Sequence, residues 1–154
     1  MAISKKSAAI IAFLLAAAAI IFSVSGFLRT ANERAAIAAG FPDIDNIAAA
    51  KIYLYDDGGL NERLAPLSEE DTSALIAVLS KLNPKGEPVD ENALEPSSGW
   101  PWEEFLVVQN DGQEHRIKAA VHHVVIDDEL AWEADYFALG ELSSLHTELY
   151  NRYI

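Results

Sequence analysis

Two tryptophans beside an irregular segment are the residues best suited to contact a ligand. Trp100 and Trp102 flank Pro101 at the end of the stretch from residue 84 to 101, which holds four prolines and two glycines. An indole ring presents a large rigid surface with one polar N–H, so such a pair can stack on a sugar or hold a peptide. The structural alternative is that Trp102 begins a strand and packs inward while Trp100 covers the edge of the core. We take Trp100 and Trp102 as the candidate ligand or partner contacts.

The four histidines invite a metal hypothesis, which their spacing does not favour. His122 and His123 are neighbours, and adjacent residues of a strand point to opposite faces, so both rings cannot bind one ion without a bulge. His115 shares a face with His123 but lies about 27 Å from it along a straight strand at about 3.4 Å per residue. The acidic segments 56–59 and 127–129 are explained more simply as turns than as calcium loops. We therefore predict no metal site and no cofactor.

Enzymatic chemistry has little support in the motifs of this chain. Adjacent carboxylates such as Glu103 and Glu104 could act as general acid and base only in a cleft that shifts a pKa. The sequence contains no G-x-S-x-G, H-E-x-x-H, P-loop or dinucleotide fingerprint. It also contains no cysteine, which removes disulfides, thiolate nucleophiles and cysteine zinc sites. We predict a protein that is not an enzyme, with a small cell-envelope enzyme using acidic residues near Trp100 as the alternative.

An uncharged segment near the start of the chain predicts how the rest is placed. Residues 7–28 carry no charge, and at about 1.5 Å rise per residue a helix of that length spans about 33 Å, enough to cross a bilayer. The segment is apolar on every face, unlike the single stripe of a surface helix. We predict that residues 1–28 are a transmembrane anchor. Cleavage as a signal peptide near Ser25, which gives a secreted protein, is the alternative.

Charge indicates the orientation and the partners. Lys5 and Lys6 precede the uncharged segment and favour a cytoplasmic N-terminus, so we predict a single-pass protein of the cell membrane with an extracytoplasmic domain. Arg29 and Arg34 at the other end leave a cytoplasmic domain as a further alternative. From Arg29 onward the chain holds 9 basic and 24 acidic residues, a net charge of −15. Such a domain repels phosphates, which excludes nucleic acid and leaves a protein or an envelope polymer as the partner beside the membrane itself.

The elements between the anchor and the tryptophans follow from local signals. Residues 29–42 are alanine-rich and extend the first helix as a stalk until Gly40 and Pro42 stop it, and the domain is expected over residues 43–154. The alternating segment 51–55 predicts a strand. Ser68, followed by acidic residues and by leucines at helical spacing, predicts a capped helix that ends before Pro84. Residues 84–101 are expected to form a surface loop.

A β-hairpin is the most specific structural signal in the domain. Asp111-Gly112 separates the β-like runs 102–109 and 114–121. A two-residue turn at this dipeptide pairs Leu106 with Ile117 on an apolar face and leaves Phe105 and Val107 on a mixed face.

A second turn and a closing helix complete the expected domain. A turn at Asp127-Asp128 returns the chain as a strand over residues 129–135, with Leu130, Trp132 and Ala134 on one face. Leucines spaced by three and four predict an amphipathic helix from about Phe137 to the C-terminus. The expected fold is α+β: a helix at the N-terminus, then a two-layer domain with an antiparallel meander of four to five strands and two amphipathic helices.

The series of a capped helix, the NDGQ hairpin, the VVIDDELAW return and the leucine-striped helix resembles small uncharacterised extracytoplasmic domains of Gram-positive bacteria that follow a signal or anchor helix. The resemblance covers about residues 50–154 and implies no functional residue, because its motifs are turns and core positions. We expect a membrane-tethered interaction module that binds through its long loop or its exposed sheet face. A structural accessory subunit of a membrane complex is a third possibility, compatible with the alanine run 16–19.

Overall fold

The computed structural model describes residues 5–56, 61–91 and 103–154. It is an α+β structure built on one antiparallel sheet of seven strands in the order β2-β1-β4-β5-β6-β7-β3. The α+β class is confirmed, while the expected number of four to five strands is wrong. In chain order the elements are α1 Lys5–Ala38, the 3₁₀ helix η1 Ile44–Asn46, β1 Ile47–Asp56, β2 Asn61–Pro66, α2 Glu69–Leu79, β3 Lys85–Asp90, β4 Glu104–Gln109, β5 Glu114–Ala119, β6 His123–Ile126, β7 Leu130–Glu133 and α3 Tyr136–Tyr153.

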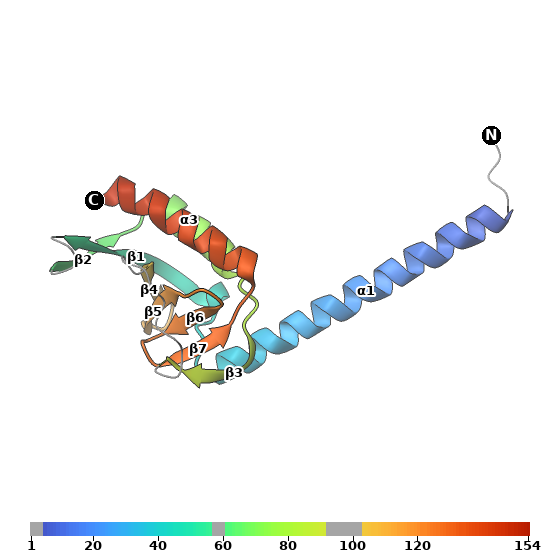
Figure 1. Ribbon diagram of the computed structural model, residues 1–154, viewed down its shortest axis with the longest axis horizontal. Coiled ribbons are helices and arrows are strands. Elements are labelled where there is room, and N and C mark those ends of the chain that lie inside the picture. The colour runs from blue at the N-terminus through green and yellow to red at the C-terminus, as the bar shows by residue number, and fades with distance from the viewer. Residues whose placement is uncertain (1–4, 57–60, 92–102) are drawn as a thin grey trace.

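Two helices cover one face of the sheet and leave the other face without a helical layer (Figure 1). Both helices begin at a side-chain cap, which satisfies backbone N–H groups that have no partner within a helix. Ser68 accepts a hydrogen bond from the backbone N–H of Asp71, and Asp135 accepts from those of Phe137 and Ala138. The capped helix after Ser68 and the C-terminal helix are therefore confirmed. The largest fully buried residues of the core beneath them are Trp132, Phe105, Ile52, Leu54, Leu75 and Leu142.

The long helix α1 projects away from the sheet, and only its C-terminal end meets the rest of the domain (Figure 1). Gly40 has a positive φ of 104° and ends the helix, as predicted. Ala36 and Phe41 lie in the core, 2% and 5% exposed, so residues that the sequence assigns to a stalk also anchor α1 to the domain. Within the residues that the structure describes, no helix has the length and hydropathy required to cross a membrane. The membrane anchor therefore stays a prediction.

The two edge strands were not predicted from the sequence. β2 is exposed at five of its six positions, and β3 has no buried residue, so neither shows the alternation that identifies a half-buried strand. Each also contains a proline, Pro66 or Pro88, which lacks the N–H of a sheet ladder and is tolerated at an edge. The surface loop expected over residues 84–101 is thus wrong where β3 lies. Residues 92–101 are outside the described residues.

The β4–β5 hairpin forms at the predicted place but in a register shifted by one residue. Its loop has three residues, and Gly112 takes the left-handed conformation at φ 87°, so Phe105 pairs with Ile117 and Leu106 with Arg116. A shift of one residue moves every side chain to the other face of the sheet. Phe105 therefore lies in the helix-covered core opposite Ile117, so the predicted faces are wrong for β4 and right for β5.

The return at the end of β6 follows the prediction. Asp127 and Asp128 both have positive φ values, 56° and 58°, which a tight hairpin turn requires and which aspartate tolerates better than most residues. The chain then runs back as β7, where Trp132 is fully buried and Ala134 just beyond the strand is 6% exposed. β4 to β7 thus form the expected meander, to which β1, β2 and β3 are added.

Candidate functional site

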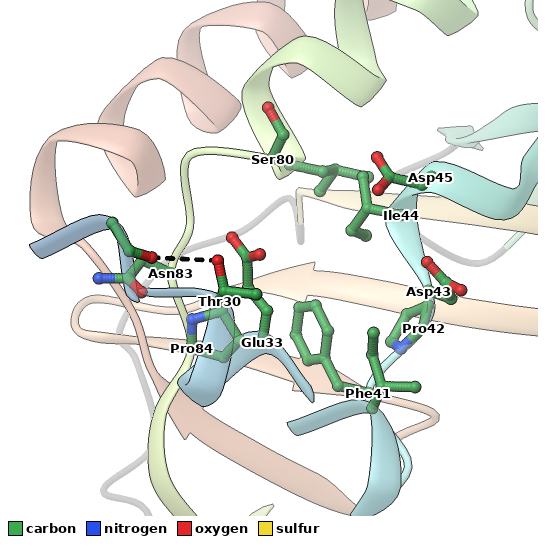
Figure 2. Close-up of a pocket in the computed structure, with 13 residues that line it drawn as sticks. Thr30, Glu33, Phe41, Pro42, Asp43, Ile44, Asp45, Ser80, Asn83 and Pro84 are labelled. Atoms are coloured by element: carbon green, nitrogen blue, oxygen red, sulfur yellow. Dashed lines mark hydrogen bonds between the residues drawn. The ribbon is translucent and has the colours of Figure 1, made fainter. Parts of the chain in front are cut away.

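A groove lies where α1 meets the domain (Figure 2). Its volume is 420 Å³. One side is formed by α1, and the other by the residues that follow α1 together with the turn at the end of α2. The side chains that line it and are used below belong to Thr30 and Glu33 of α1, to Phe41, Asp43 and Asp45, and to Ser80 and Asn83.

The end of α1 creates the groove by turning the chain sharply. The backbone N–H of Phe41 donates to the carbonyl of Ala36 over 2.9 Å, and that of Gly40 donates to Ile37 over 3.1 Å. This pair of bonds is the Schellman motif, which needs a residue in the left-handed conformation that glycine adopts without strain. The turn directs Phe41 into the core, where its ring packs edge-on against Trp132 at a centroid distance of 5.4 Å. The groove floor is therefore anchored to the most buried part of the domain.

The groove combines an apolar floor with oxygen acceptors. Phe41 contributes buried apolar surface, and the carboxylates of Glu33, Asp43 and Asp45 belong to its lining. Asp43 is held in place because its Oδ2 accepts from Asn46 Nδ2 over 2.6 Å, and Asp45 is exposed. Acidic oxygens next to apolar surface suit a ligand that has a cationic or N–H-bearing head and a hydrocarbon stem, such as a lysine or arginine side chain.

Asn83 adds an unused acceptor to this lining. It sits in the left-handed region at φ 45°, in the turn between α2 and β3. Its Oδ1 atom is buried and has no hydrogen-bond partner among the described residues. A buried acceptor without a partner costs about 1–3 kcal/mol of stability. Asparagine tolerates left-handed backbone better than most residues, which accounts for its presence in this turn.

A second cluster of charged residues occupies the face of the sheet that no helix covers. Its centre is Glu104, whose side chain is 1% exposed. The Oε2 atom of Glu104 accepts from the hydroxyl of Tyr55 over 2.5 Å and from Arg116 Nε over 2.9 Å. The guanidinium of Arg116 also lies over the ring of Tyr53, 4.3 Å from its centroid. Lys118 completes the cluster through a 2.5 Å ion pair with Asp128.

These contacts and burial shift the pKa values of Tyr55, Arg116 and Lys118. Burial raises the pKa of Tyr55, and its hydrogen bond to Glu104 raises it further, so the phenol stays neutral. Burial is the largest single influence on the pKa of Arg116 and would lower it, but the hydrogen bond and charge of Glu104, together with the charge of Asp128, raise the pKa overall. The pKa of Lys118 is raised in the same way, because the interactions with Asp128, Glu104 and Glu91 together exceed the opposing effect of burial. The cluster is therefore a charged network in which the described groups satisfy one another, and we assign it a role in stability.

The residues singled out from the sequence are dispersed. Trp100 and Trp102 lie outside the described residues. Glu103 and Glu104 do not share a cleft, because Glu103 accepts a hydrogen bond from the hydroxyl of Ser143 over 2.5 Å while Glu104 lies in the network of the open face. His122 and His123 both border a shallow hollow at the start of α3. Among the described residues no group of three potential ligands could hold a metal ion.

The groove was missed because its parts are far apart in the sequence. Thr30, Asp43 and Asn83 are joined only when α1 packs against the turn after α2. The single local signal was the Gly40 helix stop, which predicts a sharp turn but not what faces it. No protein-family model, no curated protein and no solved structure matches this chain.

Proposed function

We propose that this protein is a membrane-tethered, extracytoplasmic binding module without enzymatic activity, and that the groove beside α1 receives a positively charged segment of a partner protein. The acidic charge of the chain agrees with such a partner. The net charge is −15 from Arg29 onward, and a domain of that charge attracts cationic segments and repels acidic ones.

The observation that carries the proposal is the position of the groove along α1. Gly26 lies within the uncharged segment 7–28 and Thr30 lies just beyond it, and both line the groove together with Ser80 and Asn83. A helix that continues from a bilayer into the domain would place this groove at the membrane surface. A partner bound there would be held close to the bilayer rather than at the far end of the domain.

The exposed side chains of α1 are a further support for the tether. Phe13, Leu15 and Ile20 are 72%, 66% and 64% exposed. Large apolar side chains that are exposed together on one helix are unfavourable in water, so they are expected to be covered by lipid or by another protein. The domain itself does not cover them, since α1 projects away from it (Figure 1).

Site-specific photo-crosslinking in native membranes tests the binding role. A photoreactive residue replaces Ser80 in the groove of the full chain, and a matched one replaces Asn151, which is exposed near the end of α3. We expect discrete adducts from position 80 only, with peptides of net positive charge identified by mass spectrometry. Asp45→Lys should abolish these adducts because it reverses the charge of an exposed groove carboxylate. Adducts that are equal at both positions, or that contain acidic peptides, would contradict the proposal.

External protease tests the tether and its orientation. In intact cells the domain should be cut, and the N-terminal segment should remain in membranes after alkaline carbonate extraction. A domain that is protected until lysis would show that the orientation is wrong. Release by carbonate would show that the tether itself is wrong.

A further inference from the structure

The start of α3 carries two aromatic side chains that the domain does not bury. Tyr136 is 63% exposed and Phe137 is 79% exposed. Their rings contact each other edge-on at a centroid distance of 5.9 Å, and the ring of His122 lies 6.0 Å from that of Tyr136. Val121, in the neighbouring turn, is 61% exposed. These residues form an exposed patch, called here the aromatic patch: Val121, His122, Tyr136 and Phe137.

The fold does not require apolar residues at these positions. The helix start is stabilised by the carboxylate of Asp135, which accepts from two backbone N–H groups over 3.0 and 3.1 Å. Packing against the sheet is supplied by the next residues, Ala138 and Leu139, which are 2% and 4% exposed. Two consecutive exposed aromatic rings in a strongly acidic domain therefore indicate a surface that meets something apolar.

The aromatic patch lies at the end of the domain from which α1 extends. The backbone N–H of Asp135 donates to the carbonyl of Leu82 over 2.8 Å. Leu82 belongs to the turn that carries Ser80 and Asn83, and this turn forms the groove with Gly26 and Thr30 of α1. The start of α3 is accordingly at the side of the domain nearer to the N-terminal part of α1 (Figure 1).

The chemistry of the patch fits the boundary between lipid headgroups and acyl chains. Tyrosine, an aromatic ring with one polar tip, is enriched at that depth, and phenylalanine is typical of the apolar face that interfacial helices bury there. Lys85 borders the hollow beside Tyr136 and Phe137, and a lysine there can meet lipid phosphates. The same hollow is lined by two carboxylates: that of Asp135 is bonded to the helix start, and that of Glu133 is exposed beside Lys85.

We propose that Tyr136 and Phe137 insert into the interface of the same bilayer that α1 enters, so that the domain is held against the membrane at two points. This inference rests on the proposed membrane tether. A second contact fixes the orientation of the domain, because a single helix end would leave it free to tilt. The groove between the two contacts then faces along the membrane surface.

Single-cysteine labelling tests the contact, since the chain contains no cysteine of its own. The full chain is placed in phosphatidylcholine nanodiscs and carries one spin label, at Phe137→Cys, Ala16→Cys or Asn151→Cys. Relaxation by oxygen and by a water-soluble nickel complex reports the depth of each label. We expect Ala16→Cys to be accessible to oxygen alone and Asn151→Cys to nickel. Phe137→Cys should lie between them, with an oxygen-to-nickel ratio clearly above that of Asn151→Cys. Tyr136→Cys provides a second label in the patch.

The four labels separate the two proposals. If Ala16→Cys lies in the acyl region while both patch labels match Asn151→Cys, the second contact does not exist and the tether stands. If Ala16→Cys is also accessible to nickel, both proposals are overturned. Unchanged thermal unfolding of each variant in detergent shows that the label has not disrupted the domain.

Discussion

The two faces of the sheet are built by different physical rules. The face under α2 and α3 is closed by apolar packing, with Phe105 and Ile117 paired across the hairpin and fully buried. One residue along each strand, Glu104 pairs with Lys118 and Leu106 with Arg116 on the face without helices. Packing is tolerant of small changes in shape, whereas a buried charge requires its partners in place. The same hairpin therefore supplies both kinds of stability.

The largest effect is expected from a cavity under the helices. Phe105→Ala should lower the free energy of unfolding by about 3–5 kcal/mol, because it removes a fully buried ring from the covered face. Leu64→Ala is the matched control on the opposite face, where Leu64 is 38% exposed, and should cost no more than about 0.5 kcal/mol. Urea unfolding of the full chain in detergent measures both. An equal loss of unfolding free energy in the two variants would contradict the distinction between the faces.

The next effect comes from the centre of the open face. Glu104→Ala should cost about 3 kcal/mol, because it leaves Arg116 and the Tyr55 hydroxyl without their main acceptor. Replacing both charges, as Glu104→Leu with Arg116→Met, should restore most of that loss, since the remaining groups are no longer a broken pair. The two variants are compared by urea unfolding. If the double variant is less stable than Glu104→Ala, the expectation is contradicted. The charged pair would then stabilise the fold more than apolar residues in the same place.

Lowering the pH should reduce the stability of the domain because a histidine is buried on the face covered by the helices. His146 is 2% exposed, its ring centroid lies 5.3 Å from that of Phe105, and burial lowers its pKa to about 4 despite the hydrogen bond that the ring donates to the backbone of Tyr53. The unfolded state binds the proton first, so this histidine lowers stability as pH falls below about 6.5, by about 1.4 kcal/mol per pH unit. His146→Gln should flatten the stability profile between about pH 6.5 and 5. His122→Gln, at an exposed position, is the control substitution, and thermal unfolding at each pH compares the two variants with the unsubstituted chain.

The smallest effect belongs to the rim of the open face. Glu62 makes a 3.4 Å ion pair with Arg116, but its side chain is 47% exposed. Glu62→Gln should therefore cost no more than about 0.5 kcal/mol, because solvent already screens this pair. A cost similar to that of Glu104→Ala would show that the network acts as one unit rather than through its buried centre.

Local signals were sufficient for the elements that depend on near neighbours. The cap at Ser68, the stop at Gly40 and the turn at Asp127-Asp128 each involve residues within a few positions of one another, and all three are in the structure. The edge strands β2 and β3 could not be identified in this way. Their pairing depends on β1 and β7, and exposed edge positions place little demand on residue type.

The candidate site was beyond local signals. The sequence shows only that a hydrophobic residue, Phe41, follows a helix stop. The ring contact of Phe41 with Trp132 joins two residues that are far apart in the sequence. The unused acceptor of Asn83 arises from burial that no neighbouring residue reveals. Glu104 likewise looks like an ordinary exposed acid until the hairpin register brings it beside Arg116.

By itself the sequence determined the uncharged segment, the acidic charge, the helix ends and the leucine stripe of α3, because each depends on composition or on contacts within a few residues. The tertiary structure alone decided which face of the hairpin is buried, where Glu104 finds its partners and what surrounds the groove. The register shows the reason most directly. A third residue in the loop at Gly112 reverses the faces of β4 relative to β5, and the packing of the whole sheet selects that loop.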